Sequence, residues 1–130
     1  MASLRFQVSA LMPVPPERVY RAWLNSRSHS AMTGGVARVN ARVGAPFTAW
    51  DGYIRGRTLT LEPNRRIVQA WRTTEFADTE PDSRLEIRFA PHGAGTRVTI
   101  RHTHLPPHGM IYRQGWIDAY FTPMQAWFAR

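Results

Sequence analysis

The segment 110–129 places the strongest constraint on what this chain can fold into. Its apolar side chains recur every three or four residues, which predicts a helix with a wide apolar face. Only Arg113 and Asp118 carry a charge within it, so the helix must bury most of its circumference. Pro123 is expected to kink or divide this helix, with Thr122 as a candidate cap for the second part. The rest of the chain must therefore supply a broad apolar surface that receives a long helix.

The region between residues 36 and 104 has the alternating pattern of antiparallel strands. In RLEIRF (84–89), apolar side chains alternate with arginine and glutamate. The same alternation in TRVTIRHTH (96–104) puts His102 and His104 on the apolar face of another strand. Turn signals at 51–52 and 63–64 predict short connections, which join strands that run antiparallel to each other.

The N-terminal part predicts one strand followed by two short helices. LRFQVSAL (4–11) alternates in the same way. In VPPERVYRAWLN (14–25), Pro16 stands where a helix starts, and the apolar residues that follow form one face. A second helix is expected from Ser26 or Ser28 to Met32, ended by the glycines at 34 and 35.

This order of elements predicts an α+β protein in which residues 1–130 form a single domain. We expect a curved antiparallel sheet of about six or seven strands, with two short helices after the first strand. A long C-terminal helix would pack on the concave face of that sheet, because both elements have an apolar face to bury.

The basic residues are all arginines, 17 in number, and the chain has neither lysine nor cysteine. These absences exclude Schiff-base lysines, phosphate-loop lysines, disulfides and thiolate chemistry. The arginines are spread along the chain and fall on the polar side of predicted strands, as at Arg84, Arg88, Arg97 and Arg101. Acidic residues cluster in TTEFADTEPD (73–82). Scattered cations without interleaved aromatic side chains predict a solvated surface, so we expect no nucleic-acid partner.

No segment is apolar over the roughly 20 residues that a membrane span requires, so we expect no membrane partner. The N-terminus lacks the apolar run of a signal peptide. Together with the absence of cysteine, this predicts a cytoplasmic protein.

Several stretches resemble one known family, in the same order along the chain. The longest is ARVGAPFTAWDGYIRGRTLTLEPNRRIVQAWR (41–72), and the others are VPPERVYRAW (14–23), GTRVTI (95–100), LPP (105–107) and GWIDAYF (115–121). They resemble the C-terminal-domain family of the heat-shock-protein-90 ATPase activator, within the START-like, birch-pollen-allergen-like (SRPBCC) superfamily. The resemblance implies a helix-grip fold with a cavity between the sheet and the long helix.

Four of the matched glycines have a structural reason. Gly44, Gly52 and Gly56 are expected where a bent sheet needs a positive φ or a bend without a side chain. Gly115 is expected to let the terminal helix approach the sheet closely.

The same resemblance implies that the cavity binds a small hydrophobic molecule, aromatic or lipid-like, without a cofactor. Aromatic and methionine side chains are abundant enough to line it, and tryptophan or tyrosine offers a flat apolar face with one hydrogen-bond donor. The candidate pocket residues are Met32, Trp50, Trp71, His102, Trp116, Tyr120 and Met124. The alternative for each of them is a place in an ordinary hydrophobic core.

Catalysis and metal binding have weaker support in the sequence. A polyketide cyclase-type enzyme needs an acid and a base that face the substrate, and His102, Asp118 and Tyr120 are the candidates. Asp118 and Tyr120, two residues apart, do not share a helix face. His102, His104 and His108 lack the spacing of a metal motif and a nearby carboxylate. We therefore expect a protein without a bound metal and favour one without catalytic residues.

Two kinds of protein partner remain open. A co-chaperone-like module would bind a chaperone of the heat-shock-protein-90 class through an exposed apolar patch. A homodimer is the other possibility, because Trp127 and Phe128 lie so close to the end of the chain that one subunit has little room for both.

Overall fold

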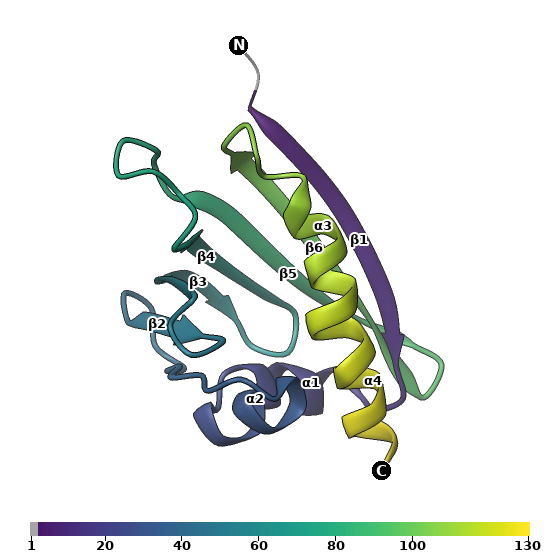
Figure 1. Cartoon of the computed structure of the whole chain (residues 1–130). Helices are drawn as coiled ribbons and strands as arrows, with labels where there is room; N and C mark the ends of the chain where they lie inside the picture. Colours follow the sequence, from purple (N-terminus) through teal and green to yellow (C-terminus); the bar gives the residue numbers. More distant parts are fainter. Residues whose placement is uncertain (1–2) are drawn as a thin grey trace.

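The structure is a computed structural model that describes residues 3–130. Six strands and four helical segments precede a short α-helix at the C-terminus (Figure 1). In chain order these elements are β1 (Leu4–Met12), α1 (Pro16–Trp23), α2 (Ser26–Thr33), β2 (Pro46–Ala49), β3 (Ile54–Glu62), β4 (Arg66–Thr73), β5 (Ser83–His92), β6 (Gly95–Leu105), α3 (Ile111–Trp116), η1 (Ile117–Phe121) and α4 (Thr122–Ala129).

The strands form one antiparallel sheet in the order β1-β6-β5-β4-β3-β2. The sheet curves around the C-terminal helix, and α1 and α2 lie at one end of the concave side (Figure 1). The expected α+β helix-grip architecture, with its curved sheet and two short helices after the first strand, is thus confirmed.

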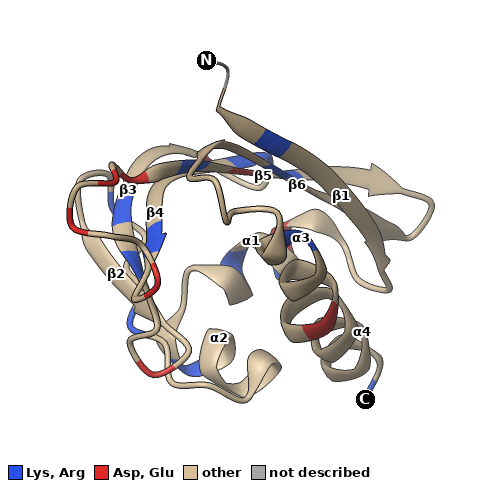
Figure 2. Ribbon diagram, turned by 45° about the horizontal axis from the view of Figure 1, so that its top comes forward, with Lys and Arg blue, Asp and Glu red and all other residues tan. Residues whose placement is uncertain are grey.

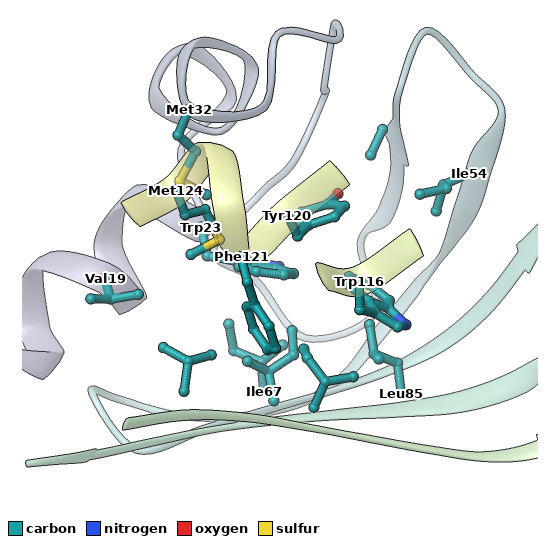
Figure 3. Packing of buried hydrophobic residues seen from close by; sticks show 14 of the residues in the cluster. Val19, Trp23, Met32, Ile54, Ile67, Leu85, Trp116, Tyr120, Phe121 and Met124 are labelled. Atoms are coloured by element: carbon teal, nitrogen blue, oxygen red, sulfur yellow. The ribbon is translucent and has the colours of Figure 1, made fainter. Parts of the chain in front are cut away.

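The predicted alternation decides which face of the sheet is buried. Ile87 of β5 pairs with Ile67 of β4 and with Ile100 of β6, and all three side chains are fully buried. Side chains of the C-terminal helix, among them Phe121, point down onto this row (Figure 3). Burial of this kind contributes about 25 cal/mol for each Å² of apolar surface removed from water, so the row stabilises the packing of the helix on the sheet.

Several strands carry arginines (Figure 2), and Arg5, Arg66, Arg84 and Arg101 gather on the opposite, convex face, as expected. Arg84, Arg97 and Arg101 are exposed there. Glu86 is buried on the same face, where Arg66 Nε lies 2.5 Å and Arg88 Nε 3.2 Å from its carboxylate. These two guanidinium groups outweigh the effect of burial and lower the pKa of Glu86.

The prediction that His104 shares the apolar face with His102 is wrong. The register between β1 and β6 shifts at this point, because Leu4 pairs with Leu105 whereas Phe6 pairs with His102. The extra residue on β6 forms a β-bulge, and His104 has a φ of 57°. This bulge turns the His104 side chain to the solvent-exposed side of the sheet.

The short helices begin and end close to the predicted positions. Pro16 is in the first turn of α1. Helix α2 starts at Ser26, and its cap is Asn25, whose side chain accepts a hydrogen bond of 3.0 Å from the Ser28 N–H. Gly34 ends α2 with a φ of 91°, a conformation that glycine adopts without a steric penalty.

The C-terminal helix changes its hydrogen-bonding pattern one turn before Pro123. In η1 the turn is π-helical, and the Thr122 N–H donates to the carbonyl of Ile117, five residues back. Thr122 itself has helical φ and ψ, so the expectation that it caps a separate helix is wrong. The wider turn keeps the helix going because it provides backbone partners around the missing proline N–H.

Two glycines matched to the family have opposite surroundings. A Cβ at Gly56 would lie 1.9 Å from the Ala70 carbonyl oxygen, so this position needs glycine for close packing of β3 on β4. A Cβ at Gly115 would meet nothing within 4 Å. The expectation that Gly115 allows a close approach of the helix is therefore wrong, and this glycine borders open space instead.

The two aromatic residues near the C-terminus both find a place on the protein. Phe128 is buried in the core, and Trp127 packs against it at a ring distance of 5.0 Å. The Arg130 guanidinium covers the Trp127 ring at 4.0 Å. Within residues 3–130, no helix is long and apolar enough to cross a membrane.

Candidate functional site

A pocket of about 350 Å³ lies between the C-terminal helix and the β2–β3 side of the sheet. Its walls come from the turn before β3, from β4 and from α3 and η1, and none of the lining residues is charged. The lining residues are Trp50, Tyr53, Ile54, Trp71, Ile111, Tyr112, Gly115, Trp116, Ala119 and Tyr120. An uncharged wall of aromatic rings is suited to an apolar, flat molecule.

Closely packed aromatic rings form one wall of this pocket. Trp116 and Tyr120 are one helical turn apart, with ring centroids separated by 4.7 Å. Trp23 of α1 packs behind Tyr120 at 4.9 Å, and Trp71 of β4 lies 5.8 Å from Trp116. Contacts of this kind hold the rings rigidly, so the wall does not need to order when a ligand arrives.

Trp50 is held at the pocket by an unusual turn. Both Trp50 and Asp51 have a positive φ, of 50° and 59°. The Asp51 carboxylate accepts a hydrogen bond of 2.9 Å from the Val36 N–H, and this bond ties the turn to the segment after α2. The Trp50 ring lies against Gly35, where a Cβ would come within 2.6 Å of it. The Trp50 Nε1–H is buried and has no hydrogen-bond partner within residues 3–130. Trp50 therefore combines a strained backbone conformation with an unsatisfied buried donor.

His102 is buried beneath the pocket wall in a chain of hydrogen bonds. The Trp116 Nε1–H donates to His102 Nδ1 at 3.1 Å, so the proton of the neutral imidazole is on Nε2. His102 Nε2 then donates to Ser83 Oγ at 2.8 Å, and Ser83 donates to the Trp71 carbonyl at 2.8 Å. Burial lowers the pKa of His102 to about 3. A second proton, on Nδ1, would point at the Trp116 N–H, so the charged imidazole would lose this hydrogen bond.

His29 makes the equivalent link on the other side of the helix, with the opposite tautomer. Its Nδ1 lies 2.8 Å from the Trp23 carbonyl, which can only accept, so Nδ1 carries the proton. Its Nε2 accepts a hydrogen bond of 2.8 Å from the Tyr120 hydroxyl. Burial lowers the pKa of His29 to about 4, and it raises the pKa of Tyr120.

Hydrogen bonds also join the elements at the pocket rim. The Tyr53 hydroxyl donates to a Glu75 carboxylate oxygen at 2.6 Å. The Tyr112 hydroxyl lies 2.6 Å from Thr73 Oγ1 and 3.1 Å from His108 Nε2. Burial and the Glu75 carboxylate raise the pKa of Tyr53. The two phenols are therefore neutral, and their polar ends are already engaged within the protein.

The structure brings four of the seven candidate residues together at the pocket, namely Trp50, Trp71, Trp116 and Tyr120. His102 lies behind the wall and contacts it through Trp116. Met32 and Met124 are almost fully buried in the core and do not line the pocket.

Six lining residues escaped the sequence analysis. Tyr112 could have been predicted from its spacing, because it precedes Trp116 and Tyr120 by one and two helical turns and so shares their helix face. Gly115 and Ala119 are small residues that leave the pocket open, and no side-chain pattern marks such a role. The remaining three are Tyr53, Ile54 and Ile111.

The three histidines considered as a metal trio lie apart. His102 is in the core, His104 on the convex face and His108 at the pocket rim. Within residues 3–130, no three histidine, aspartate or glutamate side chains are grouped so that they could hold a metal ion.

Comparison with known proteins places this geometry in a family. Residues 13–129 match the family described as "Activator of Hsp90 ATPase homolog 1-like protein". The chain belongs to this family. The human activator of 90 kDa heat shock protein ATPase homolog 1 is 26% identical over 114 residues, which cover 87% of this chain and 33% of the human protein. The chain thus spans about a third of the length of that relative.

Solved structures support the family fold. A crystal structure of an HSP90 activator from Plasmodium falciparum has a TM-score of 0.86 at 18% identity, covering 97% of this chain and 96% of that one. The solution structure of the Aha1 dimer from Colwellia psychrerythraea has a TM-score of 0.79 at 12% identity, covering 95% of both chains. At these identities the likeness shows the shared helix-grip fold.

The buried histidines of this family member predict a loss of stability in mild acid. The unfolded chain protonates its histidines near pH 6.5, whereas the folded protein holds His29 and His102 neutral to about pH 4 and 3. As the pH falls below 6.5, protons therefore bind preferentially to the unfolded state. Each histidine lowers the free energy of unfolding by up to about 1.4 kcal/mol per pH unit over that window.

Urea denaturation between pH 7 and 4 measures this effect. His102→Gln is less stable at pH 7 but has a shallower fall in stability with pH than the wild type. His92→Gln, at the exposed end of β5, is the matched control and keeps the wild-type slope. An identical slope in His102→Gln and the wild type would contradict a neutral His102.

Proposed function

We propose that this protein binds a small, uncharged, hydrophobic molecule, aromatic or lipid-like, in the pocket between the sheet and the C-terminal helix. The observation that carries the proposal is a pocket of about 350 Å³ whose walls are aromatic and uncharged. This volume lies within the usual range of small-molecule sites, roughly 300–1,000 Å³. The absence of cysteine supports a reducing compartment, and we place the protein in the cytoplasm.

Binding without catalysis is the activity that these residues support best. The imidazoles of His29 and His102 are neutral, buried and fully engaged in hydrogen bonds. The phenols that line the pocket donate or accept within the protein. Asp118, a candidate acid in the sequence, is exposed on the outer side of the helix, where it accepts a hydrogen bond from Gln114. A general acid or base would have to leave such partners before it could act.

Gly115 provides a direct test of ligand binding. Because a Cβ there meets nothing within 4 Å, the position accepts a side chain, and in Gly115→Leu that side chain takes up pocket space. The probe is N-phenyl-1-naphthylamine, an uncharged aromatic amine whose fluorescence rises in apolar surroundings. Titration should give saturable binding to the wild type and at least a tenfold weaker affinity for Gly115→Leu.

Ala126→Leu is the matched control, since Ala126 is exposed on α4 and does not line the pocket. Its affinity for the probe should equal that of the wild type. Leucine is a better helix former than glycine by up to about 1 kcal/mol, so Gly115→Leu is expected to stay folded. Absence of saturable binding to the wild type, or an equal affinity of Gly115→Leu and the wild type for the probe, would contradict the proposal.

Association with a chaperone is the second candidate function. It is favoured by membership of the activator family and by the Plasmodium falciparum HSP90 activator, whose fold matches over 96% of its own chain. Such an activity needs a surface that docks on the chaperone, and it is compatible with a ligand in the pocket.

The second candidate predicts that the purified protein raises the ATPase rate of the Hsp90-class chaperone from its source organism at least twofold. Analytical ultracentrifugation of the same mixture should show a complex, and the run on the free protein reports whether the chain also forms a homodimer. An unchanged ATPase rate together with separate sedimentation of the two proteins would rule this function out.

A further inference from the structure

A second hollow, of about 580 Å³, lies on the convex face of the sheet. Strands β1, β4, β5 and β6 contribute to it, and its lining holds four arginines and one carboxylate. The lining residues are Ser3, Arg5, Arg66, Arg84, Glu86, Arg101, Thr103 and His104. This lining shares no residue with the apolar pocket.

The carboxylate in this hollow is already neutralised. Glu86 is held by Arg66 at 2.5 Å, and Arg88, just outside the hollow, lies 3.2 Å from the other carboxylate oxygen. Arg5, Arg84 and Arg101 form no ion pair with any of residues 3–130. Three unpaired guanidinium groups that share one hollow repel one another, and an anion between them would remove that repulsion.

The sheet is locally distorted at this hollow. The bulge in β6 gives His104 a φ of 57°, a strained backbone conformation for a residue other than glycine. It also turns His104 away from the apolar face that the alternation of the strand predicts. His104 Nδ1 then lies 3.0 Å from Thr103 Oγ1, so an imidazole and a hydroxyl stand together beside the arginines. Bulges commonly redirect a side chain in this way next to functional sites.

The chemistry of these groups favours phosphate over other anions. Guanidinium groups reach the hollow from three strands, as Arg5 of β1, Arg84 of β5 and Arg101 of β6. A carboxylate has two oxygens in one plane, whereas a phosphate has oxygens in several directions and can accept paired N–H bonds from several guanidinium groups at once. No phenylalanine, tyrosine or tryptophan lines the hollow, so it lacks the aromatic platform on which single-stranded nucleic-acid binders stack successive bases.

We propose that this hollow is a binding site for the phosphate groups of a small phosphorylated or polyphosphate molecule. Arg5, Arg84 and Arg101 bind the phosphate oxygens, and Thr103 with His104 completes the set of polar groups. Glu86 and Arg66 fix the edge of the site. Because the two hollows lie on opposite faces of the sheet, this site does not depend on whether the apolar pocket binds a ligand.

Isothermal titration calorimetry with inorganic pyrophosphate tests the proposal, using the full chain. Arg84→Gln and Arg101→Gln should each weaken pyrophosphate binding at least tenfold, because each removes a positive charge and a pair of charge-assisted hydrogen bonds. Arg97→Gln is the matched control, since Arg97 is exposed on the same face of β6 as Arg101 but lies outside the hollow. Its affinity should stay within twofold of the wild type. Thermal unfolding of each variant confirms that it is folded.

Two results would overturn the proposal. One is an absence of pyrophosphate binding, or equal weakening by Arg97→Gln and Arg101→Gln, which would indicate general attraction to a protein with a net charge of +8. The other is tighter binding of a hexaglutamate peptide than of pyrophosphate with the same dependence on Arg101, which would identify the hollow as a site for acidic polypeptides.

Discussion

Two uncharged imidazoles fasten the C-terminal helix to the rest of the protein, and the other features of the structure depend on this attachment. His102 joins the helix to the sheet through Trp116, and His29 joins it to α1 and α2 through Tyr120 and the Trp23 carbonyl. Apolar contacts supply most of the burial energy, but they have little directional preference. The hydrogen bonds fix the rotation and height of the helix, because a shift would leave buried donors and acceptors without partners.

The pocket follows from this attachment. On the helix face toward the β2–β3 hairpin, Gly115 borders open space, whereas Tyr112 and Trp116 of the same helix pack on Trp71 of β4. The π-helical turn after Trp116 carries Ala119 and Tyr120, which both line the pocket. Such turns are often found at functional sites. On the other side, the strained turn at Trp50 supplies an aromatic wall.

Sequence patterns predicted the fold well because burial acts on many residues at once. The period of two in β5 and β6 and the low charge of 110–129 were enough to predict a curved sheet around a helix. Departures from these patterns at single residues could not be predicted from the sequence. The bulge that reverses His104 depends on the pairing of β1 with β6, and the space beside Gly115 depends on how far the helix stands from the hairpin. Aromatic content predicted four wall residues, yet a methionine or tryptophan pattern does not distinguish a wall from a filled core.

The protonation of the two imidazoles is the most direct test of this account. Long-range ¹H–¹⁵N NMR spectra of the labelled protein at pH 6 distinguish Nδ1–H from Nε2–H in each histidine. We expect two neutral histidines with opposite tautomers, His29 protonated on Nδ1 and His102 on Nε2, and no change in either down to pH 5. A buried histidine that titrates near pH 6.5, or the same tautomer in both, would contradict the attachment of the helix described above.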